Sequence, residues 1–312
     1  MEQSPEKTKK VERSNEMPEE WQILREKILE NFESKTDGLD IGRVKDFMKE
    51  QNLPIKDFIF LDNENKKEVS DFLIKTIPKF GEKLADFLRK EDTGAFYVPC
   101  LDIIFAKRNS VLEEINGTET TEGELIHELG HAGNDYDIFN QKNSGISRGR
   151  TGFLVRNCSD QKYRGKFLEE GFADLLRGKY MEQNLALPVK EKIEERVRTF
   201  LDKAKKTIRV PSSHTEHFDV GIKYATLSEN GSIYLSSSAI AATALEMLIA
   251  HRPQLEEILC RARNDLDYLR EIPKILNEIK PGLYEEIQKC DYSDEEIARV
   301  QNIIKEAIKN LA

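Results

Sequence analysis

Residues 124–137 read ELIHELGHAGNDYD and contain two of the five histidines of the chain. His127 and His131 are four residues apart, so on a helix they share one face, with Cβ atoms about 5–6 Å apart. Two imidazoles at this spacing can bind one cation. Glu128 would lie about 100° around the helix from His127, beside the cation, where a general base acting on metal-activated water belongs.

Zinc in such a site lowers the pKa of water to about 7. The pattern therefore predicts His127 and His131 as Zn²⁺ ligands and Glu128 as the general base, on a helix from Thr120 to Tyr136. Thr120 or Thr121 can cap this helix, since Glu124 follows Thr121 by three residues. The alternative is an ordinary amphipathic helix with two partly exposed histidines, but the scarcity of histidine argues against a chance match.

A catalytic zinc needs three protein ligands and an open fourth position. The segment KFLEEGFADLL, residues 166–176, offers Glu170 and Asp174 at i and i+4 of a second predicted helix, from Gly165 to Met181. Glu170 is the predicted third ligand, because small and apolar residues follow it. Asp174 is placed to accept a hydrogen bond from the far ring nitrogen of a ligating histidine, as carboxylates near metal sites do.

Other third ligands remain open. Asp137 stands where peptidases with the pattern H-E-x-x-H-x-x-G-x-x-D have their third ligand, although Asn134 replaces the glycine of that pattern. Glu169, next to Glu170, and a histidine further downstream are the remaining alternatives.

The combination of HELGH with EGFAD resembles the gluzincin branch of the zincin metallopeptidases, over residues 95–182. This resemblance implies a zincin-like core in which His127, His131 and Glu170 bind one Zn²⁺ and Asp174 supports the ligands. It also implies that Glu128 is the general base and that residues 102–107 form a substrate-aligning edge strand. The G-x-M-E-N segment of the zinc aminopeptidases is missing, so removal of single N-terminal residues is not supported.

The oxyanion that forms during amide hydrolysis needs a hydrogen-bond donor besides the metal. Families with this motif often draw the donor from downstream of the glutamate helix, which favours His217 and Tyr224. Further candidates are His214, Tyr234, Arg148 and Arg150.

Periodicity and composition divide the chain into four parts. Residues 1–17 are charged and predicted to be disordered, residues 18–92 form an N-terminal helical lobe, residues 93–250 form the catalytic core, and residues 251–312 form a C-terminal helical lobe. Apolar spacing predicts helices over 19–32, 41–48, 69–80 and 188–206, and Asn230-Gly231 predicts a hairpin. Residues 137–165 are expected to form a long loop or a hairpin. The fold class is therefore α+β and mainly helical.

The formal net charge of −9 over 312 residues argues against nucleic acid as a partner. No apolar leader or span of about 20 residues is present. Four cysteines without a C-x-x-C pair favour a reducing, cytoplasmic setting.

These observations predict a cytoplasmic zinc metallopeptidase, a hydrolase that acts on a peptide or protein substrate. One alternative is a regulatory intracellular protease that cleaves one specific partner protein. The other is a non-catalytic helical interaction module with a degenerate zinc site.

Overall fold

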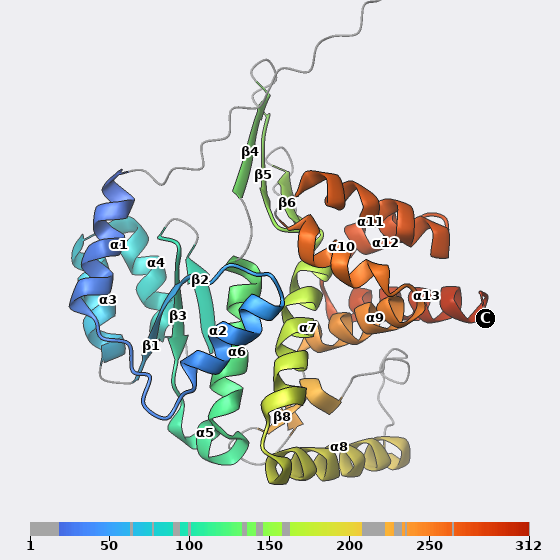
Figure 1. Cartoon of the computed structure of the whole chain (residues 1–312), viewed down its shortest axis with the longest axis horizontal. Helices are drawn as coiled ribbons and strands as arrows, with labels where there is room; N and C mark the ends of the chain where they lie inside the picture. Colours follow the sequence, from blue (N-terminus) through green and yellow to red (C-terminus); the bar gives the residue numbers. More distant parts are fainter. Residues whose placement is uncertain are drawn as a thin grey trace, which may run out of the picture.

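The computed structural model is mainly helical, with small β-sheets, which confirms the predicted α+β class (Figure 1). It describes residues 19–62, 65–76, 78–89, 94–98, 101–132, 136–141, 146–157, 163–207, 222–227, 233–234, 236–263 and 265–311. The expected disordered segment over residues 1–17 lies outside this range.

A three-stranded sheet with the order β1–β3–β2 forms the centre of the N-terminal half. The middle strand β3 (Ile103–Lys107) runs parallel to β1 (Asp57–Leu61) and antiparallel to β2 (Ala95–Val98). Side chains alternate between the two faces of a strand, and Ile103, Ile104, Phe105 and Ala106 are all buried. Both faces of this sheet must therefore be covered.

Helices provide this cover as two outer layers (Figure 1). Ile103 and Phe105 share one hydrophobic cluster with α1, α3 and α4, whereas Ile104 and Ala106 share another with α2 and α6. The helices are α1 (Glu19–Asn31), α3 (Asn65–Thr76) and α4 (Pro78–Arg89) on one face, and α2 (Ile41–Glu50) and α6 (Thr118–Ala132) on the other.

Two expectations for residues 18–92 need correction. The segment is not purely helical, because β1 pairs with β3 across the expected domain boundary. The helix expected over residues 69–80 is two helices, and the second begins at Pro78. Proline suits the first turn of a helix, where its missing N–H costs nothing.

The motif helix α6 follows α5 (Ser110–Asn116) and begins at Thr118, before the predicted cap. The hydroxyl of Thr121 donates to Glu113 Oε1 at 2.8 Å and that of Thr120 donates to the Asn116 carbonyl at 3.1 Å. The predicted cap at Thr120 or Thr121 is therefore wrong. These hydroxyls join α6 to α5 instead.

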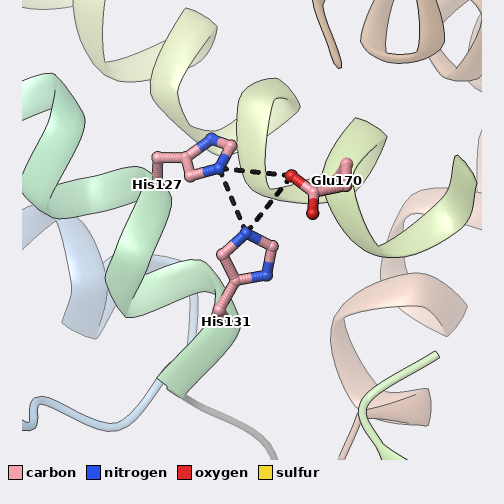
Figure 2. A group of neighbouring side chains, drawn as sticks. All are labelled: His127, His131 and Glu170. Carbon is pink, nitrogen blue, oxygen red and sulfur yellow. Dashed lines mark hydrogen bonds and ion pairs between the residues drawn. The ribbon is translucent and has the colours of Figure 1, made fainter. Parts of the chain in front are cut away.

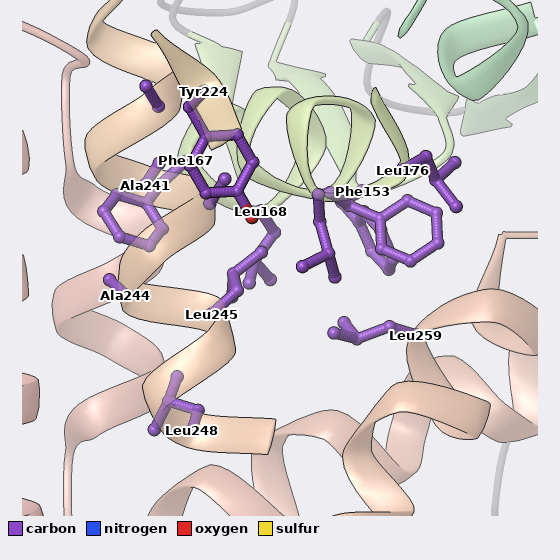
Figure 3. Packing of buried hydrophobic residues seen from close by; sticks show 14 of the residues in the cluster. Phe153, Phe167, Leu168, Leu176, Tyr224, Ala241, Ala244, Leu245, Leu248 and Leu259 are labelled. Carbon is purple, nitrogen blue, oxygen red and sulfur yellow. The ribbon is translucent and has the colours of Figure 1, made fainter. Parts of the chain in front are cut away.

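Helix α7 (Lys166–Asn184) lies between α6 and α9 (Ser237–His251), and two glycines allow the close approach. A Cβ on Gly130 of α6 would lie 3.1 Å from the Cα of Ala173, and one on Gly171 would lie 3.0 Å from the Ala241 side chain. Figure 3 shows buried side chains of α7 and α9 on the α9 side of this packing. Glu170 is thereby brought next to the histidines of α6.

Helix α9 carries the most apolar run of the chain and is buried, as predicted. Among the described helices, none combines the length and the apolarity that a bilayer crossing requires.

The chain beyond α9 is helical with breaks near Pro253, Pro281 and Asp291, as predicted. Helices α12 and α13 pack on α7 and α9, and their buried residues belong to the same hydrophobic cluster as those of α6. The core is therefore continuous across the expected boundary at residue 250. The remaining helices are α10 (Gln254–Ala262), α11 (Leu266–Ile279), α12 (Leu283–Lys289) and α13 (Asp294–Lys309).

The segment between the two motif helices is more regular than the predicted loop or hairpin. It forms an antiparallel sheet of β4 (Tyr136–Gln141), β5 (Ile146–Thr151), β6 (Leu154–Asn157) and β7 (Tyr163–Arg164). After α8 (Leu187–Thr207) and the short helix η1 (Ile222–Tyr224), β8 (Thr226–Leu227) pairs antiparallel with β9 (Ile233–Tyr234). This pairing agrees with the predicted hairpin, whose Asn230-Gly231 turn lies outside the described residues.

Gly130→Val should lower the free energy of unfolding by about 1–3 kcal/mol, because overpacking forces neighbouring backbones apart. The matched control is Gly42→Val, which places the same side chain on the exposed side of α2 and should change stability by no more than about 0.5 kcal/mol. Urea unfolding of both variants measures the difference. Equal losses would contradict the tight α6–α7 contact.

Candidate metal centre

Three side-chain tips from two helices converge at one point (Figure 2). His127 Nε2 lies 3.1 Å from His131 Nε2, and Glu170 Oε2 lies 3.7 Å from the first and 3.6 Å from the second. The histidines come from α6 and the glutamate from α7. The structure therefore brings together the three residues that the sequence predicts as metal ligands.

The separations match what a tetrahedral zinc complex requires. Zinc–ligand bonds of about 2.0–2.1 Å at tetrahedral angles place ligand atoms about 3.3–3.4 Å from each other. The observed edges of 3.1, 3.6 and 3.7 Å bracket this value. The three tips can hold one zinc-sized cation without a change in backbone.

The tautomers of both histidines also favour a cation. His127 Nδ1 lies 2.9 Å from Asp174 Oδ1, and His131 Nδ1 lies 3.0 Å from Glu169 Oε1. A carboxylate only accepts hydrogen bonds, so each Nδ1 carries a proton and each ring is oriented with Nε2 toward the cluster. The two Nε2 atoms and the Glu170 oxygen face one another. Positive charge is favoured between them, either as ring protons or as a bound cation that takes their place.

The Asp174 bridge, defined as His127, Asp174 and Arg177, holds the first imidazole. Asp174 Oδ1 accepts from His127 and lies 3.1 Å from Arg177 Nε, and the Ser236 hydroxyl donates to Oδ2 at 3.1 Å. Arg177 also donates to Glu124 Oε1 at 2.6 Å. Asp174 is 1% exposed, so these donors replace the water that it loses.

The Glu169 bridge, defined as His131, Glu169 and Arg263, holds the second imidazole in the same manner. Glu169 Oε1 accepts from His131 Nδ1 and from Arg263 at 3.3 Å, and Oε2 accepts from the Phe153 main-chain N–H at 2.9 Å. Glu169 therefore does not act as the third ligand, an alternative that the sequence leaves open. Its carboxylate is on the opposite side of the His131 ring from the ligand cluster.

Electrostatics in the cluster favour positive charge at its centre. Burial by itself lowers the pKa of His131, but hydrogen bonds to Glu169 and Glu170 outweigh it and raise this pKa to about 9. For Glu170, burial works against ionisation, yet hydrogen bonds to the two histidines hold its pKa well below the usual range. A group that stabilises added positive charge in this way suits a cation.

The predicted base, Glu128, contacts the edge of the three-stranded sheet. Its Oε2 accepts a hydrogen bond of 2.9 Å from the Tyr97 main-chain N–H of β2. Burial raises the pKa of Glu128, as suits a carboxylate that must take up a proton. The expected edge strand at residues 102–107 is wrong, since β3 lies in the middle of the sheet and β2 forms the edge.

The cluster is partly accessible to solvent. The side chains of His127, His131 and Glu170 are 13%, 18% and 27% exposed. A structural zinc site is closed by four protein ligands, whereas a catalytic site keeps one position for water or substrate. In the described part of the chain, the group that could hold a metal consists of these three residues.

Tyr224, one of the predicted oxyanion donors, is not brought to the cluster. Tyr224 is buried, and its ring fills the space beside Gly178 of α7 (Figure 3). Gly178 is two helical turns from Glu170, or about 12 Å along the axis. A phenol that faces the core at this position cannot donate to a substrate, so the prediction of Tyr224 as donor is corrected.

Several other candidates lie outside what the structure describes. His214 and His217 fall within residues 208–221, which lie outside the described ranges. Asp137 lies on β4 and Tyr234 on β9, and Arg148 and Arg150 lie on β5, but their side chains are not described.

Sequence reasoning missed three contributions to this site. The role of Glu169 could have been inferred from helical geometry, since Glu169 and Asp174 flank Glu170 on the same predicted helix and each can meet one histidine. No local sequence pattern indicates that Arg263 or the Tyr97 main-chain N–H contributes to the site, because both come from segments outside the two motif helices.

Comparisons with protein-family models, with curated proteins and with solved structures find no match to this chain.

The full-length protein should bind about one Zn²⁺ per chain, and His131→Ala should lose this metal because two ligands cannot complete the tetrahedral set. His251→Ala is the matched control, since His251 ends α9 and is not part of the cluster. Elemental analysis after dialysis against trace zinc measures the ratio. A full complement of zinc in His131→Ala would contradict the ligand assignment.

Proposed function

We propose that this protein is a zinc-dependent metallopeptidase of the zincin type, with His127, His131 and Glu170 as ligands. The observation that supports it most strongly is the convergence of two imidazole Nε2 atoms and one carboxylate oxygen, all partly exposed, at separations close to those of a tetrahedral site. Two histidines and a glutamate are also the ligand set of known zinc peptidases. The resemblance of HELGH and EGFAD to gluzincins points to the same chemistry.

Zinc in such a site acts as a Lewis acid that acidifies water and polarises a carbonyl group. The residues of the chain supply the rest. Glu128 would accept the proton of the attacking water and later deliver it to the leaving amine, as a general base and then a general acid. The Tyr97 N–H holds Oε2 of Glu128, which leaves Oε1 to handle the proton.

The position of strand β2 favours the proposal that the substrate is a polypeptide. The Lys107 N–H donates to the Gly94 carbonyl, so in the alternating antiparallel pattern Phe96 and Val98 are the residues that hydrogen-bond to β3. The main-chain groups of Ala95 and Tyr97 therefore point away from β3. An extended peptide can add to a sheet edge through main-chain hydrogen bonds. A chain bound there would lie beside Glu128, because the Tyr97 N–H already reaches this carboxylate.

Glu128→Gln should retain zinc and lose peptide cleavage by a factor of about 10²–10⁴, the usual contribution of general acid–base catalysis. The amide cannot accept the proton, but it keeps the size of the side chain. Glu114→Gln, on the exposed side of α5, is the control. Initial rates on a fluorogenic peptide library, with zinc content measured in parallel, test this proposal. Equal activity of Glu128→Gln and wild type would overturn it.

Chelation of the metal should leave the protein folded. The ligands sit on helices held together by a continuous hydrophobic core, whereas domains built around a structural zinc unfold without it. Zinc should raise the free energy of unfolding only by the mass-action contribution, which is about 2.7 kcal/mol when free metal is 100-fold above Kd. The melting temperature should rise accordingly. Circular dichroism melts with EDTA and with added zinc measure this. Loss of helical signal at 25 °C after chelation would indicate a structural metal instead.

A further inference from the structure

The Glu169 bridge extends the candidate metal centre into the C-terminal helices. Arg263 follows the last residue of α10, is fully buried, and donates to Glu169 Oε1 at 3.3 Å. The same oxygen lies 3.0 Å from His131 Nδ1. One carboxylate oxygen thus joins a predicted metal ligand to an arginine that lies 94 residues beyond Glu169 in the sequence.

The surroundings of Arg263 hold it in a defined position. Its guanidinium lies 4.8 Å from the centre of the Phe172 ring and 5.9 Å from that of Phe153. Phe172 belongs to α7, and Phe153 is the residue whose N–H donates to the second oxygen of Glu169. Planar guanidinium groups stack on aromatic rings in a way that lysine does not reproduce. The two rings therefore pack around the guanidinium and help to hold it beside the carboxylate.

The arrangement repeats on the other histidine. In the Asp174 bridge, one carboxylate oxygen also meets both a histidine Nδ1 and an arginine, and the second oxygen accepts from a third group. Arg177 takes its position from α7 itself, whereas Arg263 comes from a separate helix. The orientation of His131 thus depends on where the C-terminal end of α10 is held.

We infer that Arg263 is a positioning residue of the metal site, which acts through Glu169 to hold His131 in its ligating orientation. This inference rests on the proposed function, because it assumes that His131 binds metal. Arg263 balances the charge of a carboxylate that has little access to water and fixes its oxygen beside Nδ1. Without Arg263, Glu169 can rotate away, and the imidazole loses the contact that aims Nε2 at the cluster.

The test is a double-mutant cycle on Zn²⁺ affinity, with Arg263→Met, Glu169→Gln and the double variant. Competition with a chromophoric chelator gives the Kd. Outer carboxylate partners of metal ligands typically contribute 10- to 100-fold to affinity, so each single variant should weaken zinc binding about 10-fold or more. If Arg263 acts through Glu169, then Arg263→Met should add less than about twofold in the Glu169→Gln background, since residues in one network are non-additive.

Arg43→Met is the matched control for a purely structural effect. Arg43 donates to the buried carboxylate of Glu122 on the same motif helix at 2.6 Å, but this pair does not contact a histidine of the cluster. Arg43→Met should lower stability in urea and leave the zinc Kd within about twofold, the same bound as above. Cobalt provides a second readout: the visible spectrum of the Co²⁺ form should change in Arg263→Met and stay as in wild type in Arg43→Met.

Equal effects of Arg263→Met with and without Glu169→Gln would overturn the inference, as would an unchanged Kd in Arg263→Met. Should Arg263→Met fail to fold, Arg263→Lys replaces it in the same cycle, and additivity would again overturn the inference. Failure of the proposed function looks different, because wild type would then bind no zinc.

Discussion

The close contact between α6 and α7 is the constraint on which the rest of this structure depends. Gly130 presents no side chain to the Ala173 backbone, so the two helices approach near enough for Glu170 to reach the tips of His127 and His131. A larger residue at this contact would separate the ligands. The same contact places Glu169 and Asp174 against the Nδ1 atoms of the histidines. A single helix–helix contact therefore positions both the candidate ligands and the carboxylates that orient them.

The charges around this contact form two layers. Three acceptor atoms converge at the centre, and each histidine is backed by a buried carboxylate that is itself neutralised by an arginine. Buried charges of this kind are costly unless each one is paired and hydrogen-bonded. In both bridges every carboxylate oxygen has a donor. The arrangement therefore tolerates burial and keeps both imidazoles in one tautomer, with Nε2 directed to the cluster.

The two sides of the centre come from different parts of the chain. The sheet edge approaches from the N-terminal side, where the Tyr97 N–H meets Glu128. The C-terminal helices approach from the other side, where Arg263 meets Glu169. The continuous hydrophobic cluster that joins α2, α6, α7 and α9 to α13 explains why neither expected lobe is separate. The candidate metal ligands thus lie on two helices, whereas the groups that support them come from segments throughout the fold.

The sequence by itself determined the local features of this protein. Helical spacing placed His127 beside His131 and Glu170 beside Asp174, and proline and apolar periodicity located most helices, because these signals act over one or two turns. Only the tertiary structure decided the non-local ones: the pairing of β1 with β3, the edge position of β2, the burial of Tyr224, and the arrival of Arg263 at Glu169. Such contacts join segments far apart in the chain. No periodic pattern in the sequence indicates which distant group a hydrogen-bond donor or a strand edge will contact.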